Sequence, residues 1–312
     1  MKPTYEIQKE FRKLQPFVMP MNLVGIWLVD RGLRATMFLS GRHPMVKRTR
    51  IKMITRDGGT LHLRLFTPKK RAGNLPCVLY FPGGGFMMGP NYAHERNCAR
   101  ICAEVGCLVV LAPYRLAPRY TFPTPLSDAE DTYRFLVDHA KILSIDPLRI
   151  ALSGDSAGGT LTAGLSLLLR DTKSPMPVLE QMLYPALEGP DAKSPSRATY
   201  TDTPMFNTKR FRFIEKYFYK FGYFGLERYA FPLLHTDFAG LPPAYIETAE
   251  FDCLHDDGVR YAHVLTQAGI PVTLVETKGT FHGYDAVAKS PVTEDCIRRR
   301  IASLKQAFAP QP

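Results

Sequence analysis

Runs of apolar residues divide most of the chain into strands and helices. Polar and apolar positions alternate in 51–55 and 61–65, and the Asp57-Gly58-Gly59 turn between them predicts a β-hairpin. Farther along, short apolar runs typical of buried strands alternate with helical segments. The strand runs lie near 77–81, 107–111, 150–152, 179–184, 243–248 and 270–276, and the helices near 92–105, 124–141, 156–170 and 292–308. Continuous apolar strands between helices predict an α/β fold whose mostly parallel sheet of about eight strands is covered on both faces.

The N-terminal segment 1–48 has helical periodicity and no strand pattern. Its apolar run from Met21 to Val29 is too short, and too soon followed by charges, to span a bilayer. It reads instead as an amphipathic helix with one broad apolar face, formed by Leu23, Ile26, Trp27, Leu33 and Phe38. We expect this face to pack over the body of the protein, and binding to a membrane surface is the alternative.

A second segment, 188–240, also lacks the alternation of apolar strands and helices. It is rich in Pro, Ser, Thr and aromatic residues. We interpret it as a lid insertion that supplies apolar walls to a pocket, and a core helix followed by a linker is the alternative. The expected organisation is therefore an N-terminal helical lid segment (1–48), a core (49–187 and 241–312) and a lid insertion (188–240).

Composition favours an ordinary globular protein with a basic surface. The 312 residues carry a formal net charge of +11, but no nucleic-acid-binding motif accompanies the short basic runs Lys47-Arg48 and Arg298-Arg299-Arg300. We expect these side chains to be solvated, with a weak attraction to anionic membranes or acidic partners left open. The six cysteines form no CxxC pair and no zinc spacing, which favours a reducing, cytoplasmic compartment and no disulfide framework. No cofactor and no metal are expected.

The strongest chemical signal is Gly154-Asp155-Ser156-Ala157-Gly158-Gly159, placed where a strand meets a helix. A nucleophilic serine at such a position occupies a sharp, strained turn that exposes its hydroxyl above the sheet. Glycines two residues before and two after Ser156 leave room for the turn, since a side chain at either position would clash. The free N–H groups of the following helix would point at a developing oxyanion. We therefore predict that Ser156 is a catalytic nucleophile.

A glycine-rich loop, Pro82-Gly83-Gly84-Gly85-Phe86, directly follows a predicted buried strand. Acyl transfer passes through a tetrahedral oxyanion that requires preorganised backbone donors. The triple glycine can present two N–H groups to that point, and the N–H of Ala157 is a third. A phosphate-binding loop is disfavoured because no Gly-Lys-Ser/Thr follows.

The serine also needs a base and an acid, which in such folds follow it in the order Ser, Asp/Glu, His. Of eight histidines, His282 alone lies in a loop right after the predicted final strand. Asp252 closes the strand that precedes it, whereas Asp256 and Asp257 fall at the start of the next helix, where helix capping explains them. Asp252 and His282 are thus the predicted partners of Ser156.

These motifs resemble those of the hormone-sensitive-lipase-like family of esterases. The resemblance runs in order from about residue 75 to 285, through 114–118 (Tyr-Arg-Leu-Ala-Pro), 154–159, 184–187 (Tyr-Pro-Ala-Leu), 241–244 (Leu-Pro-Pro-Ala), 249–252 (Ala-Glu-Phe-Asp) with Asp256 and Gly258, and 282–283 (His-Gly). It implies an α/β-hydrolase fold with a lid built from the N-terminal helices and the insertion. It also implies a Ser156, Asp252 and His282 triad, with oxyanion amides from Gly84, Gly85 and Ala157. We place Phe86, Tyr184 and Phe211 in the substrate pocket.

The chain departs from the family pattern at two places that bear on the site. Pro82 stands where the family usually has His, so the side-chain bonds that steady the glycine loop are missing, although proline's fixed φ could supply stiffness. The acids that usually flank the 114–118 segment are replaced by Pro113 and Arg119. Arg115 therefore needs another partner, for which Asp128 and Asp155 are candidates.

The expected function is hydrolysis of carboxylic esters with short- to medium-chain acyl groups, with a small-molecule ester as the partner. An amidase or deacetylase using the same triad is the first alternative. A non-catalytic small-molecule receptor on this scaffold is the second, disfavoured because His282 is retained. A homodimer is left open, as relatives often dimerise.

Overall fold

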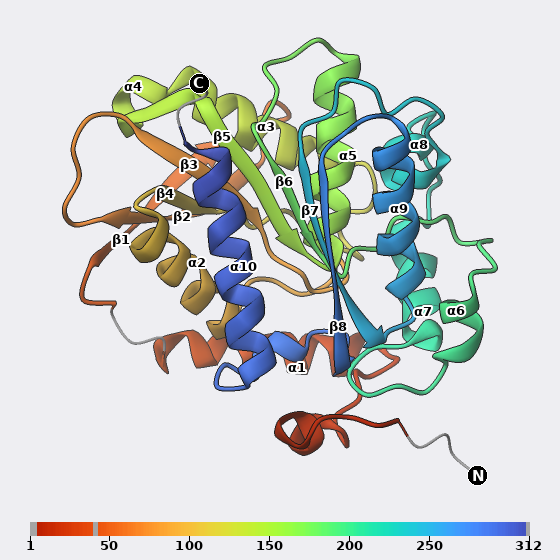
Figure 1. The fold of residues 1–312 in the computed structure, drawn as a ribbon. Coiled ribbons are helices and arrows are strands. Elements are labelled where there is room, and N and C mark those ends of the chain that lie inside the picture. The colour runs from red at the N-terminus through yellow and green to blue at the C-terminus, as the bar shows by residue number, and fades with distance from the viewer. Residues whose placement is uncertain (1–4, 40–42, 310–312) are drawn as a thin grey trace.

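A computed structural model describes residues 5–39 and 43–309 of the chain. An eight-stranded sheet forms its centre, with the order β1-β2-β4-β3-β5-β6-β7-β8 (Figure 1). The strands are β1 Val46–Ile54, β2 Thr60–Pro68, β3 Leu75–Phe81, β4 Leu108–Leu111, β5 Ile145–Asp155, β6 Glu180–Leu183, β7 Ala244–Phe251 and β8 Val272–Phe281. β1 and β2 form the predicted antiparallel hairpin, β2 pairs antiparallel with β4, and the remaining pairs are parallel. The predicted α/β architecture is confirmed.

Helices cover both faces of the sheet. The helices of the core are α2 Tyr92–Val105, α3 Thr124–Asp138, α4 Ala140–Leu143, α5 Ala157–Asp171, α9 His255–Gln267 and α10 Pro291–Ala307. α2 and α10 lie together on one face, and α3, α5 and α9 lie on the other (Figure 1). The helix predicted over 124–141 is interrupted at His139, which lies between α3 and α4.

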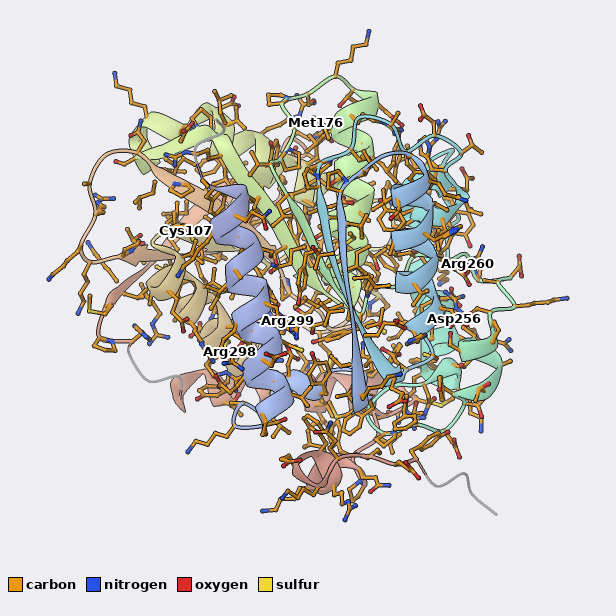
Figure 2. The ribbon with its side chains drawn as sticks, viewed as in Figure 1. Cys107, Met176, Asp256, Arg260, Arg298 and Arg299 are labelled. Carbon is orange, nitrogen blue, oxygen red and sulfur yellow. The ribbon has the colours of Figure 1, made fainter. Side chains whose placement is uncertain are left out.

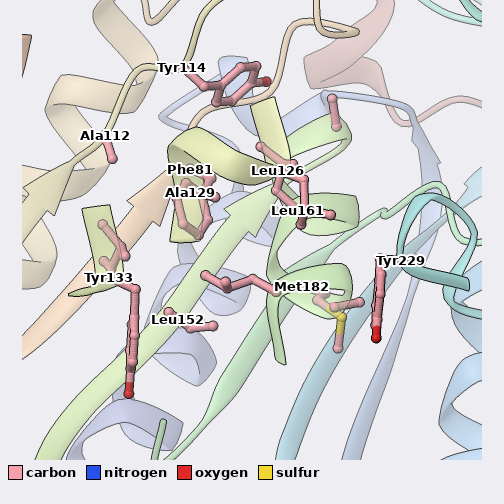
Figure 3. Close-up of a cluster of buried hydrophobic side chains, with 14 of the residues drawn as sticks. Phe81, Ala112, Tyr114, Leu126, Ala129, Tyr133, Leu152, Leu161, Met182 and Tyr229 are labelled. Carbon is pink, nitrogen blue, oxygen red and sulfur yellow. The ribbon is translucent and has the colours of Figure 1, made fainter. Parts of the chain in front are cut away.

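The alternation of side chains along β3 explains the two covered faces. Val78 and Tyr80 pack into the cluster beneath α2 and α10, whereas Leu79 and Phe81 pack into the cluster beneath α3 and α5. Figure 3 shows part of the second cluster, where Phe81 lies among apolar side chains of α3, α5 and neighbouring strands. Because both faces are buried, β3 and β4 are apolar at nearly every position, and this produces their continuous apolar runs, whereas β6 and β7 also carry the buried polar residues Glu180, Gln181 and Glu247.

The remaining helices lie in the two segments outside this core. The N-terminal segment contains η1 Lys9–Leu14, α1 Leu23–Ala35 and η2 Thr36–Leu39, and β1 begins three residues before the expected boundary at 48/49. The 188–240 segment contains α6 Pro195–Thr199, α7 Thr208–Phe218, α8 Glu227–Ala230 and η3 Pro232–Leu234, and η4 Tyr284–Ala286 follows β8. The two segments are joined where the backbone of Met205 bonds to Phe17 and Met19.

The expected packing of the α1 apolar face is wrong for Trp27. Ile26 is buried, but Trp27 is 55% exposed and Leu23 is 36% exposed. Consecutive residues of a helix differ by about 100° in direction, so Trp27 points well away from the direction of the buried Ile26. The buried Asp30 lies one turn after Ile26 and fixes the inward face, since its carboxylate accepts the Gly89 N–H at 2.8 Å. The side chain of Phe38 lies outside the described residues. No helix in 5–39 or 43–309 has the length and apolar character needed to cross a membrane.

The C-terminal arginine run is not a uniformly solvated patch. Arg298 and Arg299 lie on the outer side of α10 and pair with Asp295 (Figure 2). Arg300 is 3% exposed and pairs with Glu247 and Asp285 inside the protein. The expectation of a solvated side chain is therefore wrong for Arg300, because two buried carboxylates balance its charge.

Candidate active site

Ser156, His282 and Asp252 lie in one hydrogen-bonded row at the carboxyl edge of the sheet. His282 follows β8 and its Nε2 lies 2.8 Å from Ser156 Oγ, while its Nδ1 lies 2.7 Å from Asp252 Oδ2. Asp252 follows β7, is fully buried, and its other oxygen accepts the N–H of Leu254 at 3.0 Å. An ionised Asp252 accepts the Nδ1 hydrogen, which leaves Nε2 free to accept the hydrogen of the serine hydroxyl.

The turn at Ser156 has the geometry that its neighbouring glycines suggest. Ser156 has φ +53° and ψ −120° and lies between β5 and α5. A Cβ on Gly154 would collide with the backbone of Gly158, and a Cβ on Gly158 would collide with the carbonyl of Phe81. The two glycines therefore permit the close approach of strand and helix that projects the serine hydroxyl outward.

The glycine loop lies beside Ser156 in an unusual backbone conformation. Gly84 has φ +131° and Gly85 has φ +60°, values that other residues adopt only at a cost. Both glycines line the same cavity as Ser156. Ala157 opens α5 directly after the serine, so its backbone N–H is one of the free donors at the helix start.

Two hydrogen bonds hold the loop at the point where Pro82 stands. The Tyr114 hydroxyl donates to the carbonyl oxygen of Pro82 at 2.7 Å. The N–H of Gly83 donates to the Asp155 carboxylate, which also accepts the Tyr80 hydroxyl at 2.8 Å. The loop is thus tied to the residue that directly precedes Ser156.

A cavity of about 600 Å³ opens above the serine. Ser156, His282 and the glycine loop line one part of it. The N-terminal segment contributes Phe17, Met19, Leu33 and Thr36, and the 188–240 segment contributes Met205, Phe206 and Ile214. Side chains from both segments that we expected to form a lid therefore make apolar walls of this cavity.

Of the three expected pocket residues, Tyr184 lines the cavity and the other two do not. Phe86 and Phe211 border a separate small cavity of about 20 Å³, which shares Ile214 with the larger one. Phe86 has φ +57° and its ring stacks on that of Phe218 at 3.8 Å. The Arg197 guanidinium lies over the Phe211 ring, with Cζ 4.4 Å from the ring centroid. Neither ring lines the larger cavity, because both find partners in the core.

The sequence interpretation missed Phe206 and Asp285, which lie beside His282 and the expected Tyr184. The ring centroids of Tyr184 and Phe206 lie 4.9 and 4.8 Å from that of His282, so the imidazole is held between two aromatic rings. The Tyr184 hydroxyl donates to Asp285 at 2.6 Å, and Asp285 in turn pairs with Arg300. Nothing in the sequence signals Phe206, whereas Asp285 follows the predicted base by three residues and is a polar residue in an apolar stretch.

Asp256 and Asp257, which we did not assign as partners of His282, bind other groups. Asp256 accepts the N–H of Ser196, and Asp257 accepts the N–H of Leu187 and pairs with Arg197. Burial raises the pKa of Asp257 to about 6. Both lie in the first turn of α9, but they connect that helix to other segments and do not cap it.

Arg115 binds the first of its two candidate partners. Its guanidinium forms a two-pronged bond with Asp128, with an Nη2–Oδ1 distance of 2.6 Å, and a further ion pair with Asp57 at 2.8 Å. Asp155 instead faces Tyr80 and His94. Asp57 is the turn residue of the β1–β2 hairpin, so Arg115 ties the hairpin to α3.

The arrangement offers a nucleophile, a base, an acid and backbone donors without an evident metal site. Within the described residues, no group of three or more His, Cys, Asp or Glu side chains could hold a metal ion. A serine, histidine and aspartate in hydrogen-bond contact can form and break an acyl bond.

Comparisons with known proteins place this geometry among hydrolases. Residues 78–286 match the family described as the alpha/beta hydrolase fold. Two curated relatives come from Mycobacterium tuberculosis: Esterase LipI is 32% identical over 85% of this chain and 84% of its own, and Carboxylesterase NlhH is 34% identical over 81% and 80%. Among solved structures, a protein titled Bacterial Heroin Esterase superposes with a TM-score of 0.91 at 32% identity, covering 98% of this chain and 99% of its own.

Proposed function

The chain belongs to the hormone-sensitive-lipase-like family of α/β-hydrolase esterases, and we propose that it hydrolyses carboxylic esters through an acyl-enzyme on Ser156. One observation carries the proposal: the unbroken row of hydrogen bonds from Asp252 through His282 to the Ser156 hydroxyl, on the floor of an apolar cavity. The esterase names of relatives that align over most of the chain support the same chemistry.

In the first half-reaction, His282 Nε2 accepts the Ser156 proton as Oγ bonds to the ester carbonyl carbon. The tetrahedral intermediate collapses when the C–O bond to the alcohol breaks and His282 returns the proton to the departing oxygen. In the second, His282 takes a proton from water, whose oxygen attacks the acyl carbon. The carboxylic acid then leaves and the proton returns to Ser156. Asp252 keeps the imidazole oriented and stabilises its charged form.

We assign the oxyanion site to the backbone N–H groups of Gly84, Gly85 and Ala157. The glycine conformations and the position of Ala157 at the start of α5 support this assignment. Such donors stabilise negative charge that is present only in the tetrahedral state, and loss of one costs on the order of 10²–10³ in turnover.

We propose esters with short- to medium-chain acyl groups as substrates, and the size and lining of the cavity support this choice. Its volume of about 600 Å³ lies within the range of small-molecule sites, and its walls include Phe17, Leu33, Phe206 and Ile214. Because residues 1–48 and 188–240 both supply these walls, we propose that together they act as the lid.

We also propose cytoplasmic residence, supported by six cysteines that are all buried and unpaired. A homodimer stays a prediction, to be checked by sedimentation.

The experiment is a chain-length series of p-nitrophenyl esters, from acetate to dodecanoate, with wild type and Ser156→Ala. We expect wild type to favour short and medium chains and Ser156→Ala to lose turnover by a factor on the order of 10⁴ or more. Ser174→Ala, a change outside the cavity, is the matched control. Undiminished ester cleavage by Ser156→Ala would overturn the proposal. A matched pair of ester and anilide substrates separates the esterase from the amidase, and a wild type inactive on both would revive the receptor alternative.

A further inference from the structure

An apolar strip covers the outer surface of residues 17–28. We call it the N-terminal apolar strip, and it consists of Phe17, Val18, Met21, Leu23, Val24, Trp27 and Leu28. The exposed fractions of these side chains run from 36% to 69%. Seven of the fourteen exposed large apolar side chains in the described part of the chain lie in this strip, while the others are spread from Met45 to Leu234. Such clustering marks an interaction surface, whereas single exposed apolar residues do not.

α1 has apolar side chains on its outer side as well as on its inner side. Val24, Trp27 and Leu28 follow the helical spacing i, i+3, i+4 and face solvent, with Val24 69% exposed. The inward side carries Ile26 and the charged Asp30, which bonds to Gly89 N–H and pairs with Arg34. These inward bonds fix the helix with Val24, Trp27 and Leu28 outward.

The segment that carries the N-terminal apolar strip has mostly positive exposed charges. Within residues 9–35 the exposed basic side chains are those of Lys9, Arg12, Lys13, Arg31 and Arg34. The acidic residues of the same segment are Glu10 and Asp30, and Asp30 is buried. The Arg31 guanidinium lies 5.3 Å from the Trp27 ring centroid. Tryptophan beside basic side chains suits the boundary between lipid headgroups and acyl chains, and anionic lipids attract such a surface.

We propose that the N-terminal apolar strip docks on the surface of an anionic lipid bilayer. Val24, Trp27 and Leu28 enter the upper acyl region, and the basic side chains contact the headgroups. The helix is only 13 residues long, so it lies in the interface and does not span it. Phe17 belongs both to the strip and to the wall of the cavity that holds Ser156, so docking places the cavity beside the lipid. The docking itself does not depend on the chemistry proposed for Ser156.

A bilayer fits this surface better than a second copy of the chain does. In a two-fold contact the same patch lies on both partners. A second copy would therefore bring a second, mostly positive segment against the first, and like charges at an interface are unfavourable. An anionic bilayer supplies the opposite charge.

The test uses the full chain and vesicles of phosphatidylcholine with about one part in four of phosphatidylglycerol. Binding is measured by co-sedimentation and by the emission of Trp27, the single tryptophan of the chain. We expect the protein to sediment with anionic vesicles, less so at high salt, with a blue shift of the emission. Vesicles of phosphatidylcholine alone should bind less protein.

Two double variants locate the binding surface. Val24→Glu/Leu28→Glu should lower the partition coefficient about tenfold or more, since two charges enter the proposed acyl contact. Ile142→Glu/Leu148→Glu adds the same charge at side chains 80% and 77% exposed outside the strip, and should bind like wild type. Circular dichroism checks that both remain folded. Absence of vesicle binding by wild type, or equal loss in both variants, would overturn the proposal. A third outcome would also overturn it: wild type self-associates but does not bind vesicles, and Val24→Glu/Leu28→Glu does not self-associate. That result would assign the strip to a second copy of the chain.

Discussion

His94 Nε2 lies 3.3 Å from Oδ2 of Asp155, the residue that directly precedes Ser156. The Asn91 N–H donates to His94 Nδ1 at 3.0 Å, so Nε2 carries a hydrogen and donates it to Asp155. Asp155 also accepts the N–H of Gly83 in the glycine loop. Burial disfavours the Asp155 carboxylate, but His94, the Tyr80 hydroxyl and the Gly83 N–H outweigh it and lower the pKa of Asp155. His94 thus supports the loop in which Pro82 replaces the family's usual histidine.

This contact makes His94 a positioning residue, and His94→Leu tests it. Loss of one donor to a buried carboxylate should loosen both the serine turn and the glycine loop, lowering kcat by about tenfold or more with a smaller change in KM. His94→Gln retains an N–H donor and should recover most of kcat. Steady-state kinetics on one aryl ester, beside urea unfolding of each variant, makes the measurement. Equal kcat in wild type and His94→Leu would exclude the positioning role.

The steric demand at Gly85 yields a second prediction. A Cβ at this position would force Cδ1 of Ile214 to shift, and φ is already +60°, a conformation that strains any residue other than glycine. Gly85→Ala should therefore displace the proposed oxyanion amide and lower kcat on the order of 10²-fold. Gly73→Ala is a close control, because Gly73 has φ +63° but open space around its Cα. It should cost about 1 kcal/mol of stability and leave kcat unchanged. If both variants lost turnover equally, backbone strain and not the loop position would be responsible.

Ile214 separates the main cavity from the small cavity behind it. Its side chain lines both, and the rear cavity is bordered by Phe86, Phe211 and Phe218. Ile214→Ala should join the two spaces and shift kcat/KM toward longer or bulkier esters, at a stability cost of about 2–4 kcal/mol. Ile101→Ala removes another buried isoleucine, on α2, and controls for that cost. The ratio of kcat/KM for octanoate to acetate esters, compared between the two variants, gives the result. An unchanged ratio in Ile214→Ala would show that this wall does not limit substrate size.

Glu180 gives the stability a pH dependence. Its carboxyl is fully buried on β6, and burial, only partly offset by the nearby Ser166 hydroxyl, raises its pKa from 4.5 to about 8. Between pH 4.5 and 8 the unfolded chain releases a proton that the folded protein retains. The contribution of Glu180 to the free energy of unfolding is therefore full below pH 4.5 and is lost as the pH rises toward 8. Glu180→Gln mimics the protonated form. Near pH 5 the free energy of unfolding of Glu180→Gln should match that of wild type. The difference in favour of the variant should then grow by about 1.4 kcal/mol for each pH unit up to pH 8.

Urea unfolding at pH 5, 6, 7 and 8 measures this difference, with the exposed Glu227→Gln as control. A constant gap between wild type and Glu180→Gln across the series would mean that the carboxylate is accommodated in the folded state.

The central strands and the row of polar groups were predictable from the sequence for local reasons. A strand buried on both faces is mostly apolar, and the ends of parallel strands meet at one edge, where Ser156, Asp252 and His282 follow β5, β7 and β8. The direction of α1 was not predictable. It depends on a bond between Asp30 and Gly89, residues far apart in the sequence.

The same limit explains the pocket residues and the arginine run. An aromatic residue near a site can line the cavity or turn into the core, and Phe86 turns away because its ring stacks on Phe218. Arg300 lies beside two exposed arginines, yet Glu247 and Asp285 draw it inside. Phe206 touches His282 only because the 188–240 segment folds back over the sheet edge. The direction of each of these side chains depends on a partner far away in the sequence, so the neighbouring residues do not predict it.

The central claim, that Ser156 is the nucleophile, is tested most directly by covalent labelling with a fluorophosphonate and peptide mass mapping. The account predicts stoichiometric modification on the peptide that contains Ser156, slow labelling when His282→Gln removes the base, and no labelling of Ser156→Ala. Normal labelling of His255→Gln, a histidine outside the site, would serve as the control. Modification at another residue, or an active enzyme whose Ser156 stays unmodified, would contradict it.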